Sequence, residues 1–183
     1  MRRFRSRALL PALVPFLLLA AACTPSTINP RVTTVASVDV SRYLGTWFEI
    51  ASVKQFFSVG LVDTTANYSL RPDGTILVVN SGRYFGKDGP ISTVVGSAFP
   101  VDGTNTKLNV SFTGTNSATP PGNYWIVALD PNYQWAVVSD PTGLSAFILS
   151  RTPTIPPALK ADLIARAVAA GVDTSNLTDT PQP

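Results

Sequence analysis

From Asp39 to Arg151 the chain alternates short stretches of β-branched and aromatic residues with clusters of Gly, Pro, Asp and Asn. The first group of residues favours strands, and the second favours turns. The turn signals lie at 71–74, 86–90, 100–104, 114–122, 130–132 and 140–143. Short strands at such fairly regular spacing indicate an all-β sandwich or barrel.

Eight strands are expected from this pattern, in simple succession and mostly joined by short turns. Their expected bounds are 45–54, 62–70, 75–84, 91–99, 106–113, 123–129, 134–139 and 145–151. A sandwich would need longer crossing connections, whereas an up-and-down barrel needs none and leaves no exposed sheet edge. We therefore predict an all-β fold, an eight-stranded antiparallel up-and-down barrel, which is a size that can enclose one small ligand.

One helical pattern follows the predicted barrel. Apolar residues recur at helix spacing from Leu159 to Val168, between a pair of prolines and Gly171. We expect a single C-terminal α-helix packed outside the barrel, so that barrel and helix together occupy residues 39–171. Residues 172–183 are polar and end in proline, which predicts a mobile tail.

The N-terminal residues have the pattern of an export signal. Arginines are frequent in the first seven residues, and an apolar run from Ala8 to Ala22 ends in small residues before Cys23. The run is short and broken by prolines, which disfavours a membrane span. Leu19 to Cys23 resembles a bacterial lipobox, with Ala20 where leucine is usual, so residues 1–22 are predicted to be a lipoprotein signal peptide and Cys23 to be lipidated. Residues 23–38, rich in Thr, Pro and Ser, are predicted to be a flexible tether.

The positive charge of the chain is concentrated in the predicted signal. The whole sequence has 14 Lys and Arg against 11 Asp and Glu, a formal charge of +3. Four of the arginines and none of the acids precede Cys23, so 10 cations face 11 acids from there on, a net charge of −1. Nucleic acid is therefore excluded as an expected partner, because its binding depends on Lys and Arg contacts to phosphates.

The side chains that usually carry catalysis are scarce. The chain has no histidine, one glutamate (Glu49) and one cysteine (Cys23). This composition offers no internal disulfide, no zinc-type cluster and no nucleophile–histidine pair. Most aspartates lie in turn signals, where they bond nearby backbone. We expect no catalytic residue, no metal site and no cofactor.

The expected alternation of the strands predicts which side chains line the barrel interior. Several of these positions are small or polar, which leaves volume for a ligand in a mostly apolar pocket. The alternative is that large residues fill the barrel, as in a packed core. The predicted ligand-binding set is Ala51, Ala66, Tyr68, Val78, Asn80, Tyr84, Val110, Phe112, Tyr124, Ile126, Ala136, Val138, Phe147 and Leu149.

The strand predicted at 123–129 is apolar on its second face as well. Trp125, Val127 and Leu129 lie on the face opposite to Tyr124 and Ile126. Such a face must be covered, either by the C-terminal helix or by a partner chain. A homodimer is therefore one of two possibilities.

Two separated motifs, Tyr43–Ala51 and Ile148–Ile155, resemble those of the bacterial lipocalins, particularly the outer-membrane lipoprotein type. The resemblance implies a barrel that is closed at one end and binds a fatty acid or lysophospholipid inside. It also implies that Trp47 lies on the closed floor with Arg151 stacked across it, and that Tyr124 lies near the ligand head group. The protein would then be secreted across the inner membrane and lipid-anchored in the bacterial cell envelope through Cys23.

Three functional hypotheses follow. The first is a membrane-tethered lipocalin that stores or transports a small hydrophobic ligand by reversible burial. The second is a lipocalin-fold enzyme acting on a lipid or isoprenoid, in which Glu49 or a tyrosine moves a proton. The third is an envelope interaction protein whose barrel is filled.

Overall fold

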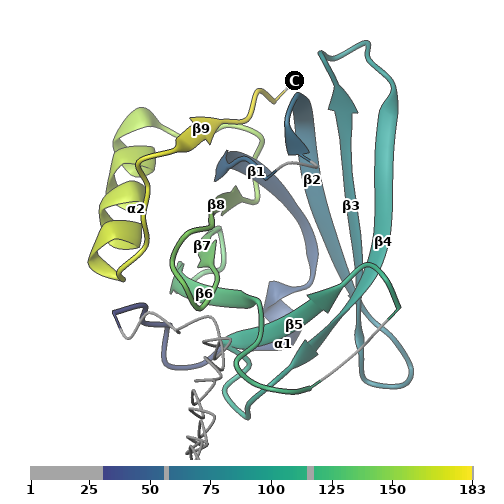
Figure 1. Cartoon of the computed structure of the whole chain (residues 1–183), viewed down its shortest axis with the longest axis vertical. Coiled ribbons are helices and arrows are strands. Elements are labelled where there is room, and N and C mark those ends of the chain that lie inside the picture. The colour runs from purple at the N-terminus through teal and green to yellow at the C-terminus, as the bar shows by residue number, and fades with distance from the viewer. Residues whose placement is uncertain (1–30, 56–57, 115–117, 183) are drawn as a thin grey trace, which may run out of the picture.

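The computed structural model describes residues 31–55, 58–114 and 118–182, and Figure 1 shows a curved sheet with one long helix outside it. The predicted signal peptide and Cys23 lie outside the described residues. The helices are α1 (Val40–Tyr43) and α2 (Pro157–Ala169). The strands are β1 (Gly45–Val53), β2 (Leu61–Leu70), β3 (Ile76–Tyr84), β4 (Ile91–Pro100), β5 (Lys107–Ser111), β6 (Tyr124–Leu129), β7 (Trp135–Ser139), β8 (Ala146–Ser150) and β9 (Leu177–Asp179).

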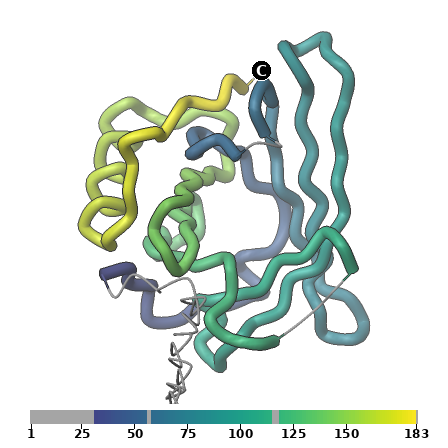
Figure 2. Tube along the Cα trace, in the orientation of Figure 1, coloured from purple at the N-terminus to yellow at the C-terminus, as the bar shows by residue number. Residues whose placement is uncertain are grey.

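The first eight strands form a closed antiparallel barrel. Each strand from β1 to β8 pairs with the next along the chain, and β1 also pairs with β8, which closes the ring seen in Figure 2. The predicted all-β barrel of eight strands is confirmed, and every strand lies within two residues of its expected bounds. The helix α2 also lies where it was predicted.

The two ends of the barrel differ in their connections. At the closed end, the short helix α1 directly precedes β1 and lies with the turns β2–β3, β4–β5 and β6–β7. The other end, called the open end below, carries the connections β1–β2, β3–β4, β5–β6 and β7–β8. The four-residue helix α1 was not predicted, because one helical turn is too short to show an apolar period.

The apolar residues pack into two cores, one on each side of the barrel wall. The inner core surrounds the buried Trp47, while the outer core lies between the wall and α2, with Leu163 and Ala167 of the helix fully buried. Trp125 and Val127 belong to the outer core, so this face is covered within the chain and gives no reason to expect a homodimer. Leu129 packs against the inner core instead, contrary to the prediction, because a β-bulge between Ile126 and Ala128 reverses the alternation. Both cores consist of residues from Val32 onward. Among the described residues, neither helix is long and apolar enough to span a membrane.

The last part of the predicted tether packs against the barrel, contrary to expectation. The amide of Val35 donates to Ile126 O at 3.0 Å, and that of Thr33 donates to Ala170 O at the same distance. Val32 and Val38 are buried in the outer and inner cores. Residues 31–38 therefore form part of the folded domain, held by backbone hydrogen bonds and isolated valines rather than by a periodic apolar face.

The segment after α2 is likewise ordered, so the prediction of a mobile tail from residue 172 is wrong. The strand β9 pairs with the last residues of β1, and the amide of Thr180 donates to Ile50 O at 2.9 Å. The β1–β2 ladder ends at Phe48 and Thr65. Beyond this point the Gln182 Nε2 atom donates to the carbonyl of Glu49 on β1 at 2.7 Å and to that of Thr64 on β2 at 3.0 Å.

Polar composition concealed this role, because backbone hydrogen bonds fix the segment and do not require apolar side chains. Residues 177–182 therefore complete the barrel wall where β1 and β2 separate. We call these residues the C-terminal wedge.

Candidate functional site

The floor of the barrel is formed by Trp47 and Arg151. The Arg151 guanidinium lies 3.7 Å from the centre of the indole ring, as the resemblance implies. The same guanidinium donates to the carbonyls of Thr46 at 2.8 Å and of Leu44 at 2.9 Å. A cation over an indole face contributes about 0.5–2 kcal/mol, and the hydrogen bonds fix its position. At this end of the barrel the Arg151 guanidinium therefore covers the Trp47 ring and is held there by backbone carbonyls.

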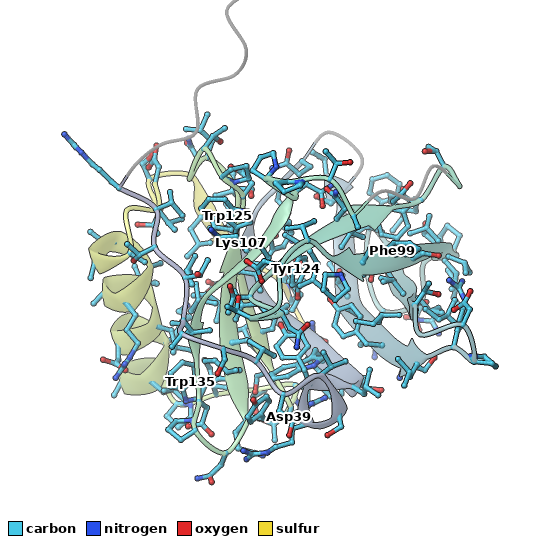
Figure 3. The ribbon with its side chains drawn as sticks, turned by 90° about the horizontal axis from the view of Figure 1, so that it is seen from below. Asp39, Phe99, Lys107, Tyr124, Trp125 and Trp135 are labelled. Carbon is cyan, nitrogen blue, oxygen red and sulfur yellow. The ribbon has the colours of Figure 1, made fainter. Side chains whose placement is uncertain are left out.

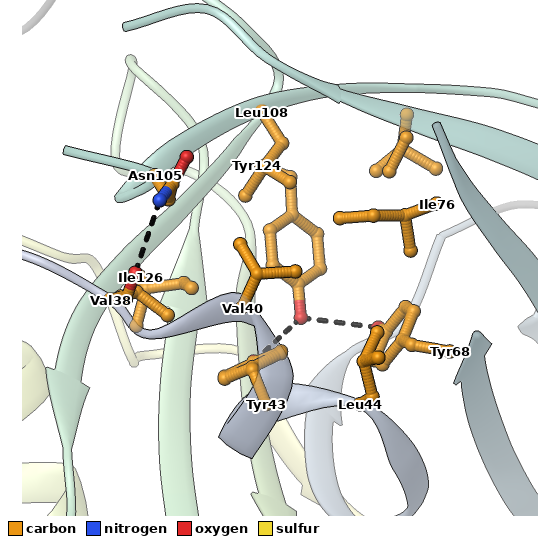
Figure 4. Close-up of a pocket in the computed structure, with 12 residues that line it drawn as sticks. Val38, Val40, Tyr43, Leu44, Tyr68, Ile76, Asn105, Leu108, Tyr124 and Ile126 are labelled. Carbon is orange, nitrogen blue, oxygen red and sulfur yellow. Dashed lines mark hydrogen bonds between the residues drawn. The ribbon is translucent and has the colours of Figure 1, made fainter. Parts of the chain in front are cut away.

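Three tyrosines lie close together next to this floor (Figure 4), with the ring of Tyr43 centred 4.9 Å from that of Trp47. The hydroxyl of Tyr124 lies 2.9 Å from that of Tyr43 and 3.1 Å from that of Tyr68. Burial raises the pKa of Tyr68 to about 12 and also raises the pKa values of Tyr43 and Tyr124, so all three are neutral near pH 7. Three hydroxyl protons serve two hydrogen bonds, which leaves one proton for a further acceptor.

The pocket beside the tyrosines is almost filled. Its lining is nearly all apolar and includes Val40, Leu44 and Ile76 (Figure 4). The remaining cavity is about 20 Å³, which is room for about one water molecule. This pocket therefore has no space for an acyl chain in this conformation. A second, more open hollow of about 470 Å³ lies at the same end of the barrel, and its lining includes Val40, Leu44 and Leu70.

The interior toward the open end is accessible. Val94 pairs with Asn80 and so shares the inward face with Val78 of the inner core, yet its side chain is 47% exposed. Phe112 is 44% exposed, and its ring lies against the inner side of Gly96, where an added Cβ would approach Phe112 Cδ1 to 2.7 Å. We call the inward-facing region around Asn80, Val94 and Phe112 the calyx.

One side of the calyx carries a charged pair. Glu49 pairs with Leu149 of the inner core and is buried, and its Oε1 atom accepts from Lys54 Nζ at 2.6 Å and from Ser52 Oγ at 2.8 Å. The hydroxyl of Thr180 in the C-terminal wedge donates to the same atom. Removal of this carboxylate would leave the partly buried ammonium of Lys54 without its counter-charge, so the pair contributes to the stability of the wall.

No metal centre accompanies this pair. Among the described residues, no three His, Cys, Asp or Glu side chains come together in a way that could hold a metal ion.

The structure places thirteen of the fourteen predicted interior residues inside the barrel. Their role as ligand contacts stays a prediction. The buried ones are Tyr68, Val78, Ile126, Ala136, Val138 and Leu149, the partly buried ones are Ala66, Asn80, Tyr84, Val110, Tyr124 and Phe147, and the exposed one is Phe112.

The prediction for Ala51 is wrong. A β-bulge in β1 changes the register, so that Glu49 pairs with Leu149 but Ala51 pairs with Ile148. Ala51 consequently faces α2 in the outer core, and Ser52, opposite Phe147, takes the inward position. A bulge inserts one residue and reverses the alternation beyond it, whereas the prediction assumed an unbroken period of two.

Two interior positions were missed for identifiable reasons. On β4, Val94 and Val95 are both apolar and both largely exposed, so alternation does not distinguish the inward from the outward side chain. Tyr43 lies in α1, which was not predicted. Val94 could have been identified from the register of the β3–β4 hairpin, because it pairs with Asn80, which was predicted to face inward.

Comparisons with known proteins agree with this geometry. Residues 38–182 match the model of the lipocalin-like domain family. The chain is 39% identical over 165 residues to the outer membrane lipoprotein Blc of Citrobacter freundii, covering 90% of this chain and 91% of that protein. It is also 39% identical to temperature-induced lipocalin-1 of Arabidopsis thaliana, with 81% of each chain covered.

A solved structure supports the fold independently. The cockroach allergen Per a 4 superposes with a TM-score of 0.61 at 18% identity, covering 83% of this chain and 94% of that one. The family model includes the C-terminal wedge as well as the barrel and α2. From Val38 to Gln182, the chain belongs to the lipocalin family.

Proposed function

We propose that this protein is a membrane-anchored lipocalin that binds, stores or transports a small hydrophobic ligand, a fatty acid or lysophospholipid, in the calyx. The observation that carries the proposal is the exposure of Val94 and Phe112 on the inner face of the barrel. An interior that only filled itself would bury such side chains.

The energetics of acyl burial are favourable. A chain that places about ten methylenes against these walls gains on the order of 8 kcal/mol gross, before ordering costs. The Glu49–Lys54 pair is already compensated, so affinity rests mainly on apolar contact. The spare hydroxyl proton of the tyrosine cluster supports a polar group of the ligand pointing toward the closed end, provided that the pocket beside Tyr124 opens.

The proposed anchor is the lipidated Cys23, which places the protein in the cell envelope. Support comes from the signal pattern of residues 1–22 and from the Citrobacter relative, which is itself named an outer membrane lipoprotein. Cells grown with labelled palmitate should incorporate the label into the protein, and Cys23→Ser should abolish incorporation. Label retained by the serine variant would contradict the anchor at this residue.

Two neighbouring valines on β4 allow a matched test of the calyx. Val94 points inward and Val95 points outward, and their exposures are 47% and 57%. A tryptophan at position 94 should occupy the space of an acyl chain, while one at position 95 should lie outside the wall. We expect Val94→Trp to weaken binding of a fluorescent fatty acid by about tenfold or more and Val95→Trp to leave it unchanged.

Native mass spectrometry of the purified protein, followed by lipid extraction, completes the test. The wild type and Val95→Trp should both carry a bound amphiphile, and added fatty acid should raise their melting temperatures. Equal binding by the two tryptophan variants would reject the calyx as the site. No amphiphile and no thermal shift in the wild type would favour a filled barrel.

A further inference from the structure

Several large apolar side chains are exposed at the open end of the barrel. Phe85 is 88% exposed, and Val59 in the β1–β2 connection, Ile91 at the start of β4 and Leu144 in the β7–β8 connection are each more than 60% exposed. These four residues are called the open rim. They belong to three of the four connections that surround the mouth of the calyx.

Phe85 is unfavourable at its position in two ways. Its φ of 64° lies in the left-handed region, which bulky side chains rarely adopt. Its ring is also left in water, where an apolar side chain gains nothing from burial. The Phe85 amide donates to Gly60 O at 2.9 Å, which ties the β3–β4 hairpin to the connection that carries Val59. Strained residues of this kind concentrate at functional sites.

The N-terminal segment reaches the barrel at the open end. Arg31 lies against Gly171, and the amide of Asp173 donates to Gly143 O in the β7–β8 connection, next to Leu144. From Arg31 the segment runs the length of the barrel to Asp39, which lies at the opposite edge from Trp125 in Figure 3.

The proposed anchor therefore lies within reach of the β7–β8 side of the mouth. Cys23 is eight residues before Arg31, so the connecting chain spans at most about 28 Å. A membrane contact at the closed end would require this chain to run back along the whole barrel. Contact at the open end requires no such reversal.

We propose that the open rim rests on the surface of a lipid bilayer, with the mouth of the calyx facing the lipid. Side chains of the rim then enter the boundary between head groups and acyl chains, which supplies the burial that they lack in water. A ligand passes between bilayer and calyx without full exposure to water. The orientation rests on the proposed anchor, while the affinity of the rim for lipid can be measured without it.

The test uses the chain from Thr24 onward, which lacks Cys23 but contains every described element and both cores. The rim variant is Phe85→Asn with Ile91→Thr, because asparagine tolerates the left-handed conformation and threonine suits a strand. The matched control makes the same kinds of change elsewhere, with Leu70→Asn at the closed end and Val95→Thr on the outer wall. Both control positions are also more than half exposed.

Sedimentation with phosphatidylcholine vesicles should show partitioning of the wild type and the control, and about tenfold weaker partitioning of the rim variant. Transfer of a fluorescent fatty acid from vesicles to the rim variant should be slower by a similar factor. Urea unfolding should show the rim variant to be at least as stable as the wild type, so misfolding does not explain the loss.

Equal partitioning of the rim variant and the control, or no partitioning of the wild type, would overturn the inference. A concentration-dependent dimer of the wild type that the rim variant abolishes would assign the rim to a second copy and would also overturn it. Binding of fatty acid from dilute solution, without vesicles, is measured in parallel. If that binding persists when the vesicle tests contradict a membrane contact of the rim, the proposal that the calyx binds a ligand is retained.

Discussion

At the closed end of the barrel, the Arg151 guanidinium covers Trp47 and donates to carbonyls of the chain entering β1. At the open end, Phe85 extends into solvent from a strained turn, and Val94 lines a wall without being buried. Both ends are built on the same eight strands. The difference indicates that contacts at the closed end stabilise the fold, whereas the open end leaves large apolar side chains uncovered.

The largest expected effect on stability lies at the closed end. Arg151→Ala removes the cation over Trp47 and leaves several carbonyls without a donor, which should lower the free energy of unfolding by about 3 kcal/mol. Arg42→Ala is the control, because Arg42 also covers an aromatic ring, that of Tyr133 at 4.1 Å, but is exposed. The free energies of unfolding of the two variants are compared by urea denaturation, which requires that both have the same m value. Similar losses in the two variants would contradict a special role for Arg151.

A second test makes the same substitution toward each end of the interior. Val78 is 1% exposed in the inner core, whereas Val94 lies in the calyx. Val78→Ala should lower the free energy of unfolding by about 2 kcal/mol, because it leaves a cavity in the inner core. Val94→Ala should change the free energy of unfolding by no more than about 0.5 kcal/mol. Ligand-free protein is required, since bound lipid adds its own stability. A larger loss from Val94→Ala than from Val78→Ala would reverse the comparison.

The smallest expected effect concerns pH. Because burial raises the pKa of Tyr68 to about 12, the folded protein keeps a proton that the unfolded chain releases above about pH 10. Stability is therefore complete below that pH and falls as pH rises toward the folded pKa. Tyr68→Phe should reduce this alkaline loss by about 1 kcal/mol. Equal slopes of unfolding free energy against pH in the two proteins would show that Tyr68 is not the source.

Most of the fold could be predicted from the sequence, because turn residues separate the strands and α2 has an apolar period. Features without such a signal were missed. The bulge beyond Glu49 reversed the facing of Ala51, and the paired valines of β4 concealed Val94. The C-terminal wedge is held by backbone and amide hydrogen bonds, which leave little trace in residue type. The candidate site was thus predicted well where strands alternate regularly and poorly where they do not.

The C-terminal wedge also bears on the order in which the barrel can form. Residues 177–182 are the last described residues to be synthesised, yet Gln182 joins β1 to β2, two strands made more than a hundred residues earlier. Until residues 177–182 have been made, the backbone groups of β1 and β2 beyond the end of their ladder at Phe48 and Thr65 lack the hydrogen-bond partners that this segment provides. The calyx therefore acquires its complete wall only after residues 177–182 have been made.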